Sequence, residues 1–220
     1  MVVLLVIFII VGVVNITAIV LKREKLRQTS KCLIIPPLLA AYITGAGNLF
    51  LFPIPALILG WIGDVLLLNI QKRTYFFLGL ASFLLGHLCY TITFIGILGF
   101  FDFNGTINIP AIAIFTIPTI ILGMVVFRLI KPTKEMSIPV IVYMIVLVTM
   151  SLLGFQVFLF NPGVAGLLIL SGCFYFMVSD TILAYYIFRK PKLWGSFLLM
   201  FFYILAQAEI VLGLMLLPKT

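Results

Sequence analysis

The chain has 220 residues, of which 64% are apolar and only 9% are charged, and its mean hydropathy is +1.34. A soluble domain carries about 25% charged residues, so this composition excludes a soluble enzyme and a disordered chain and indicates an integral membrane protein. The net charge of +8 does not indicate nucleic-acid binding, because the lysines and arginines lie in short gaps between apolar runs rather than on one exposed basic face.

Apolar runs of about 20 residues cross a bilayer as helices, and the sequence contains eight candidates. They are Met1–Leu21, Cys32–Phe52, Ile54–Ile70, Thr74–Leu98, Ala111–Ile130, Met136–Phe160, Val164–Phe188 and Leu193–Leu217. The gaps between them are too short for a soluble domain. We therefore expect residues 1–220 to form one all-α domain, an integral membrane bundle of eight transmembrane helices.

The basic residues predict the orientation of this bundle. Thirteen of the fourteen lysines and arginines lie on one side of the predicted spans, and Lys219 is the exception. The positive-inside rule makes that side cytoplasmic and places both termini outside. The first apolar run is not typical of a signal peptide, because its basic residues follow the run instead of preceding it. We expect a multi-pass protein of a bacterial cell membrane.

Cysteine and histidine give little support for a metal site. The three cysteines, Cys32, Cys89 and Cys173, all fall inside predicted spans and are not clustered, so neither a disulfide framework nor a metal motif is visible. The chain has one histidine, His87, whereas a catalytic zinc site usually needs three protein ligands. The sequence therefore predicts neither a metal nor any other cofactor.

Ionisable residues within the spans are the strongest functional candidates, because a carboxylate in a bilayer costs several kcal/mol. Three acids lie there: Asp64, Asp180 and Glu209. The helical rise of about 1.5 Å per residue places Asp64 and Asp180 roughly 10 and 12 Å from the cytoplasmic edge. On the same scale Tyr203 lies at roughly 15 Å, and His87 and Gln207 at roughly 20 Å. We expect one polar pocket; the alternative is a polar cluster that only holds the helices together.

Small residues recur at helical spacing beside these candidates. Gly60 and Gly63 precede Asp64, and Gly79, Ser82 and Gly86 precede Tyr90. Such residues allow close approach of membrane helices. Glu209 points away from the face of its helix that carries Tyr203 and Gln207, and we interpret it as a structural partner, with Asn48 at a similar depth as a candidate contact.

A weak internal repeat is also visible. Asp64 precedes His87 by 23 residues, and Asp180 precedes Tyr203 by the same number, which gives an offset of 116 residues between the two halves. This spacing predicts a four-plus-four duplication with parallel repeats.

The order of the polar motifs resembles the YhhN-like lysoplasmalogenase family over essentially the whole chain. The motifs are Lys31 with Pro36, Gly63-Asp64, Gly86-His87-Leu88-Cys89-Tyr90, Ser179-Asp180 and Tyr203-Ile204-Leu205-Ala206-Gln207. The resemblance implies an eight-helix hydrolase that cleaves the vinyl-ether bond of a lysoplasmalogen with a phosphocholine or phosphoethanolamine head group. The products are a fatty aldehyde and a glycerophospho-base, and the expected partner is a lysophospholipid within the bilayer.

Independently of the resemblance, two buried carboxyl groups suit this chemistry. A vinyl ether is hydrolysed by protonation at carbon, followed by attack of water on the resulting oxocarbenium ion. One of Asp64 and Asp180 would give the proton and the other, ionised, would stabilise the cation; the sequence does not say which. His87, Tyr90, Tyr203 and Gln207 are candidates to bind or orient substrate or water. Lys31, expected at the cytoplasmic rim, is a candidate for the lipid phosphate or an ordinary positive-inside anchor.

Two other functions use membrane acids. An intramembrane aspartyl protease needs Tyr-Asp and Gly-x-Gly-Asp motifs, whereas here Ser179 precedes Asp180 and two residues separate Gly60 from Gly63. A non-enzymatic transporter or proton-coupled carrier also places acids within its spans. Transporters favour broken helices near the site, and neither Pro36-Pro37 nor Pro118 adjoins an aspartate. The carrier is the principal alternative to the hydrolase.

Overall fold

The computed structural model describes residues 1–47, 49–99, 109–189 and 193–217, and this part of the chain forms eight α-helices and one 3₁₀ turn. The helices are α1 (Val2–Val20), α2 (Glu24–Gly45), α3 (Pro53–Leu66), α4 (Arg73–Ile97), α5 (Ile109–Ile130), α6 (Lys134–Phe160), α7 (Val164–Phe188) and α8 (Leu193–Leu216). The 3₁₀ turn η1 (Leu67–Asn69) follows α3 directly. The predicted all-α fold is confirmed.

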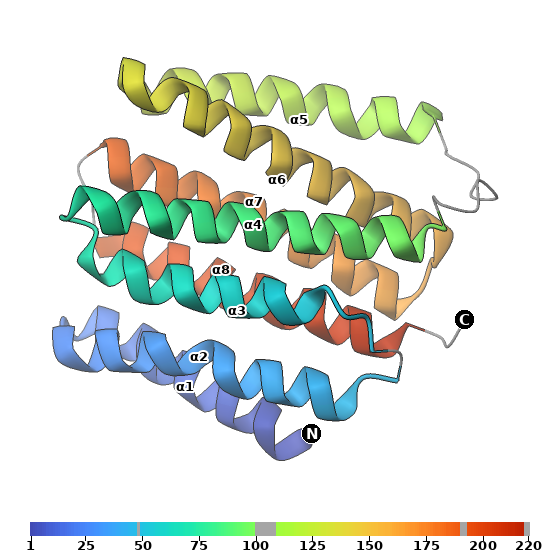
Figure 1. The fold of residues 1–220 in the computed structure, drawn as a ribbon, viewed down its shortest axis with the longest axis horizontal. Helices are drawn as coiled ribbons and strands as arrows, with labels where there is room; N and C mark the ends of the chain where they lie inside the picture. The colour runs from blue at the N-terminus through green and yellow to red at the C-terminus, as the bar shows by residue number, and fades with distance from the viewer. Residues whose placement is uncertain (48, 100–108, 190–192, 218–220) are drawn as a thin grey trace.

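The helices run side by side and alternate in direction, so that α1 begins and α8 ends at the same end of the bundle (Figure 1). Within the described ranges, six helices, all except α2 and α3, are long and apolar enough to cross a membrane. The helices α2 and α3 lie alongside the other six (Figure 1). Their crossing of the membrane, and the side on which the termini lie, stay predictions.

The predicted boundaries of the second span, Cys32–Phe52, were wrong at both ends. The helix α2 begins eight residues earlier, at Glu24, and ends at Gly45. Polar residues near its start indicated a loop, yet they stabilise a helix: Glu24 accepts hydrogen bonds from Arg27 and Gln28, one turn later, and an acid suits a helix N-terminus. The hydrogen bonds from Arg27 also lower the pKa of Glu24 below its usual value.

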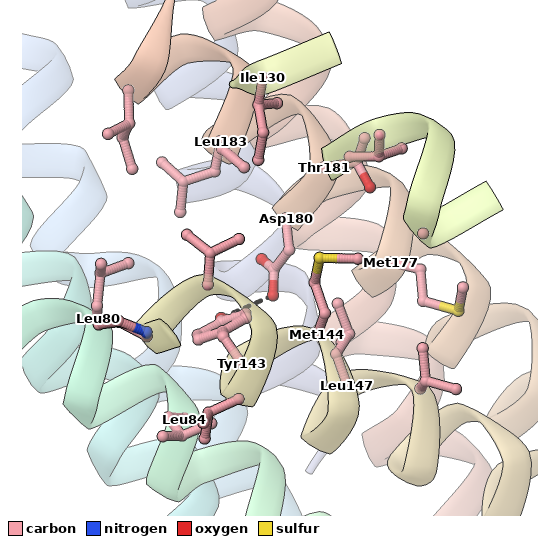
Figure 2. A pocket seen from close by; sticks show the side chains of 18 of the residues that line it. Leu80, Leu84, Ile130, Tyr143, Met144, Leu147, Met177, Asp180, Thr181 and Leu183 are labelled. Carbon is pink, nitrogen blue, oxygen red and sulfur yellow. Dashed lines mark hydrogen bonds between the residues drawn. The ribbon is translucent and has the colours of Figure 1, made fainter. Parts of the chain in front are cut away.

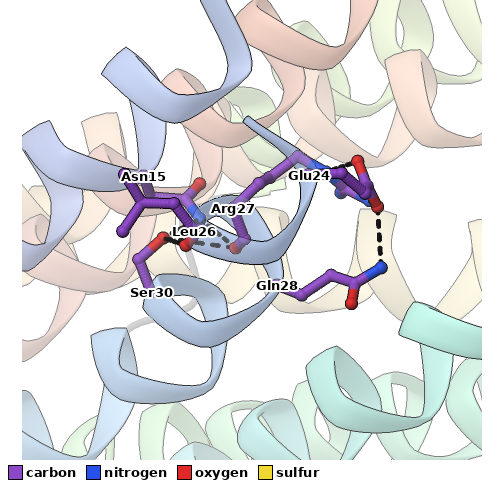
Figure 3. Close-up of polar contacts among 6 residues, drawn as sticks. All are labelled: Asn15, Glu24, Leu26, Arg27, Gln28 and Ser30. Carbon is purple, nitrogen blue, oxygen red and sulfur yellow. Dashed lines mark hydrogen bonds and ion pairs between the residues drawn. The ribbon is translucent and has the colours of Figure 1, made fainter. Parts of the chain in front are cut away.

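Polar contacts on one side of this turn hold α1 against α2 (Figure 3). The buried side chain of Asn15 donates one hydrogen bond to the carbonyl oxygen of Arg27 and another to Ser30 Oγ, at 2.8 and 2.9 Å. Ser30 Oγ in turn donates to the carbonyl oxygen of Leu26. The first helix of the bundle is therefore fixed to the second by hydrogen bonds as well as by apolar packing.

Close packing between α3 and α4 depends on the small residues noted in the sequence. A Cβ atom at Gly63 would lie 2.7 Å from the ring of Phe83, and one at Gly86 would lie 3.2 Å from the carbonyl oxygen of Ala56. Ser82 Oγ also donates a hydrogen bond across this interface to the carbonyl oxygen of Leu59, at 2.6 Å. The predicted role of these small residues in helix packing is confirmed.

At the interface of α7 and α8, Gly172 offers a direct test of this packing. We expect Gly172→Ala to destabilise the protein by about 1–3 kcal/mol, the usual cost of overpacking. The new methyl carbon would lie 2.9 Å from the backbone nitrogen of Ile210 and 3.0 Å from the carbonyl oxygen of Ala206, and neither backbone atom can move alone. Thermal unfolding in detergent measures the effect. Gly96→Ala in α4 is the control, since its methyl group meets nothing within 4 Å; equal stability of the two variants would contradict the prediction.

Candidate active site

An apolar cavity of about 570 Å³ lies between α4, α5, α6 and α7. Its volume is in the range of ligand-binding pockets. Apolar side chains such as Leu84, Leu147 and Met177 dominate the lining, and the carboxyl group of Asp180 points into it (Figure 2). Of the acids in the described ranges, Asp180 alone is among the lining residues.

The carboxyl group of Asp180 has two polar neighbours from other helices. Tyr143 on α6 donates a hydrogen bond to Asp180 Oδ2 at 2.7 Å (Figure 2). His87 on α4 places Nε2 3.5 Å from the same oxygen. The imidazole is buried, and in the described part of the chain its Nε2 has no hydrogen-bond partner. His87 can therefore hold a further polar group beside Asp180.

Asp64 lies in a second cluster, which differs from the cluster around Asp180 because it contains a lysine. Lys31 Nζ on α2 is 3.2 Å from Asp64 Oδ1, and Tyr203 on α8 donates a hydrogen bond to Asp64 Oδ2 at 2.6 Å. The side chains of Lys31 and Asp64 are only 12% and 2% exposed. A carboxylate in this position is compensated by a cation and a hydroxyl group, as buried charges require.

The expected place of Lys31 at the cytoplasmic rim stays a prediction, and the structure adds a partner for its ammonium group. Because α2 begins at Glu24, Lys31 is seven residues into the helix, roughly 10 Å along its axis. Its ammonium group pairs with Asp64 in the interior. The pair gives Lys31 a role in compensating the charge of Asp64, beside which the lipid phosphate and the anchoring role stay predictions.

Aromatic rings connect the two clusters. Phe176 on α7 packs edge-on against Tyr203, with 5.9 Å between ring centroids, and against His87, at 4.8 Å. One continuous set of contacts thus leads from Asp64 through Tyr203, Phe176 and His87 to Asp180. The structure brings the predicted residues into two neighbouring clusters on either side of Phe176, and Asp64 is not among the residues that line the cavity.

Tyr90 and Gln207 pair with each other. Tyr90 on α4 donates a hydrogen bond to Gln207 Oε1 on α8 at 2.9 Å, and both side chains are buried. A Cβ atom at Gly60 would lie 3.3 Å from Gln207 Nε2 and 3.7 Å from the hydroxyl oxygen of Tyr203. The absent side chain at Gly60 therefore allows α3, which carries Asp64, to approach α8 closely.

The partners of the two aspartates follow the predicted four-plus-four pattern of helices. Each aspartate lies on the third helix of its half, takes one partner from the second helix of the same half, and takes the other from the last helix of the opposite half. For Asp64 these partners are Lys31 and Tyr203, and for Asp180 they are Tyr143 and His87. The pattern is the one that parallel repeats produce, although the duplication itself stays a prediction.

Sequence reasoning missed Tyr143. A signal was present, because Tyr143 lies nine residues after Lys134, roughly 14 Å into the helix and near the depth estimated for Asp180. Glu209 has a buried oxygen without a hydrogen-bond partner in the described ranges. Its proposed partner Asn48 lies outside the described residues. In those ranges no three His, Cys, Asp or Glu side chains gather as metal ligands would.

Comparison with protein-family models matches residues 26–214, from the start of α2 to the end of α8, with the YhhN family. The chain belongs to the YhhN family. The resemblance inferred from the motifs is confirmed, and since the YhhN family is the lysoplasmalogenase family, membership supports a lysoplasmalogenase-like membrane protein. The helix α1 precedes the residues matched by the YhhN model. Comparisons with curated proteins and with solved structures gave no significant match.

The buried ion pair can be tested against an exposed one. Lys31→Met leaves the carboxylate of Asp64 buried without its cation, and we expect it to lower the free energy of unfolding by about 3–5 kcal/mol. Arg73→Met breaks the pair of Arg73 with Glu135, whose side chains are 76% and 75% exposed, and should cost less than about 1 kcal/mol. Thermal unfolding in detergent gives the comparison. Adding Asp64→Asn to Lys31→Met should restore part of the loss, and equal costs for the two single variants would contradict the buried pair.

Proposed function

We propose that this protein hydrolyses the vinyl-ether bond of lysoplasmalogens and releases a fatty aldehyde and a glycerophospho-base. The observation that carries the proposal is the carboxyl group of Asp180, which points into an apolar cavity beside Tyr143 and His87. An apolar cavity accepts a hydrocarbon chain, and a single acid in its wall can meet a polar bond near the end of that chain. Membership of the YhhN family supports the same class of reaction.

The two aspartates have different partners, and we assign them different roles. In the described part of the chain Asp180 has no lysine or arginine within ion-pair distance, and apolar surroundings without a cation favour the neutral carboxylic acid. Asp64 is paired with Lys31, which favours the ionised carboxylate. Asp180 is therefore the proton donor, and Asp64 is the charged partner that opposes the positive charge of the intermediate.

The reaction then follows in two stages. Asp180 transfers its proton to the outer carbon of the double bond, and the carbon bonded to oxygen becomes an oxocarbenium ion. Water adds to that carbon and returns a proton to the carboxylate of Asp180. In the resulting hemiacetal the hydroxyl proton passes to the glycerol oxygen as the bond from carbon to that oxygen breaks, which gives the aldehyde and the glycerol hydroxyl group. As in glycoside hydrolysis, a carboxylic acid gives the proton and an oxocarbenium ion forms, but here Asp64 acts from outside the cavity, across Phe176.

The attacking water needs a polar group that holds it near Asp180. His87 suits this role because Nε2 is 3.5 Å from Asp180 Oδ2 and has no hydrogen-bond partner among the described residues. Its ring is held between Phe176 and Tyr143 by edge-on contacts. We assign Tyr143 to positioning of the Asp180 carboxyl group, through the hydrogen bond to Oδ2.

Neutral amide substitutions test the two carboxyl groups. We expect Asp180→Asn and Asp64→Asn each to lower the turnover of a lysoplasmalogen by at least about 100-fold, the lower range for loss of general acid–base catalysis. The double variant should be scarcely slower than either single one, because residues that act as a unit are not additive. Released aldehyde from purified protein in detergent gives the rate.

Glu135→Gln is the matched control, since it makes the same change at an exposed acid whose ion pair within the described ranges is with Arg73, and it should keep full activity. A folded Asp180→Asn protein with normal turnover would overturn the assignment. Proton-coupled flux in vesicles, with no aldehyde from any lysolipid, would favour the carrier in place of the hydrolase.

A further inference from the structure

A second apolar cavity, of about 560 Å³, lies between α5, α6 and α7. It shares four lining residues with the first cavity: Thr119, Leu122, Phe174 and Met177. Leu167 and Leu170 of the second cavity lie further from Asp180 along α7 than the shared residues Phe174 and Met177. The two cavities therefore follow one another along the helix axes. We call the two cavities together the tail groove.

The polar groups that the proposed reaction uses lie in the first cavity of the tail groove. Asp180 and Tyr143 lie in the first cavity, whereas Leu167 marks the far limit of the second on α7. Thirteen residues separate Asp180 from Leu167 in the sequence, which corresponds to roughly 20 Å along a helix. At the depth predicted for Asp180, roughly 12 Å from the cytoplasmic edge, a groove of this length would reach beyond the middle of a bilayer core about 30 Å thick.

Cations lie at the opposite limit of the first cavity. Ile130 and Phe188 line that end, and they are followed in the sequence by Lys131 and Arg189. The guanidinium group of Arg189 donates two hydrogen bonds to the carbonyl oxygen of Leu129, which ties the ends of α7 and α5 together. A lipid with its phosphate near these cations would place the start of its chain near Asp180 and the rest of the chain in the second cavity.

We propose that the tail groove binds a single long alkenyl chain and that the second cavity selects substrates by chain length. The proposal rests on the proposed function and specifies its substrate class. The cavities follow one another along the same three helices, whereas the two chains of a diacyl lipid lie side by side. A lipid with one chain therefore fits this shape. Leu122 and Phe174, at the junction, are 53% and 55% exposed, which gives the chain a lateral way in from the bilayer.

Chain-length profiles test the selection. The rate of aldehyde release, as kcat/KM, is measured for a series of lysoplasmalogens that differ only in chain length. For the unsubstituted protein kcat/KM should rise with chain length. Leu170→Trp fills part of the second cavity and should lower the ratio of kcat/KM for the longest chain over the shortest about tenfold, the lower range for steric discrimination in an apolar pocket.

Leu85→Trp is the matched control, because Leu85 lies on α4, is 49% exposed and does not line either cavity. Its profile should be that of the unsubstituted protein. If Leu170→Trp is as stable as the unsubstituted protein and shows the same dependence of kcat/KM on chain length, the proposal is overturned. Equal hydrolysis of lysoplasmalogens and of plasmalogens that carry an alkenyl and an acyl chain would overturn the single-chain assignment.

A binding measurement separates this proposal from the proposed hydrolysis. Saturated alkyl-ether lysolipids cannot undergo vinyl-ether hydrolysis, and a lipid that binds the folded protein raises its melting temperature. For the unsubstituted protein, the increase in melting temperature should grow with the chain length of the lipid. For Leu170→Trp, it should not depend on chain length. Length-dependent binding without aldehyde release from any substrate would overturn the proposed function alone. Aldehyde release without length-dependent binding would overturn only the proposed role of the tail groove in selecting chain length.

Discussion

The ion pair between Lys31 and Asp64 is the contact on which the arrangement of the site depends. A charged carboxylate within a bilayer is costly unless a cation compensates it, and Lys31 supplies that cation from α2 at 3.2 Å. The hydrogen bond from Tyr203 adds α8 to the same carboxylate. Three helices that are distant in sequence, α2, α3 and α8, are thus held together at one point in the interior.

The second aspartate occupies an equivalent place in the other half of the bundle but has different neighbours. A tyrosine, Tyr143, stands where the first half supplies a lysine, and His87 stands where the second half supplies Tyr203. Because each aspartate takes a partner from the opposite half, neither half holds a complete set of polar contacts. In the proposed mechanism, the lysine beside Asp64 and the lack of a lysine or arginine beside Asp180 in the described ranges give the two carboxyl groups opposite tasks, as paired acids have in known hydrolases.

Much of the fold and part of the site could be predicted from the sequence. The apolar runs gave α1 and each of α4 to α8 to within two residues at both ends, because hydropathy alone limits a helix in a membrane. Hydropathy did not give the bounds of α2, because the charged first turns of this helix are helical. Asp64 and Asp180 were found because acids are rare within apolar spans, and their depth could be estimated by counting residues. The sequence could not show which helices are neighbours, because α6 meets α4 and α7 only through tertiary packing. Tyr143 and Phe176 were therefore missed.

The central claim is that Asp180 is a neutral acid while Asp64 is an ionised carboxylate. Infrared spectroscopy of the purified protein at neutral pH tests it most directly, because a protonated carboxyl group absorbs at a higher frequency than a carboxylate. The band of a buried protonated carboxyl group should disappear in Asp180→Asn and persist in Asp64→Asn, which should instead lose a carboxylate band. Loss of the protonated band in Asp64→Asn, or its absence from the unsubstituted protein, would contradict the account.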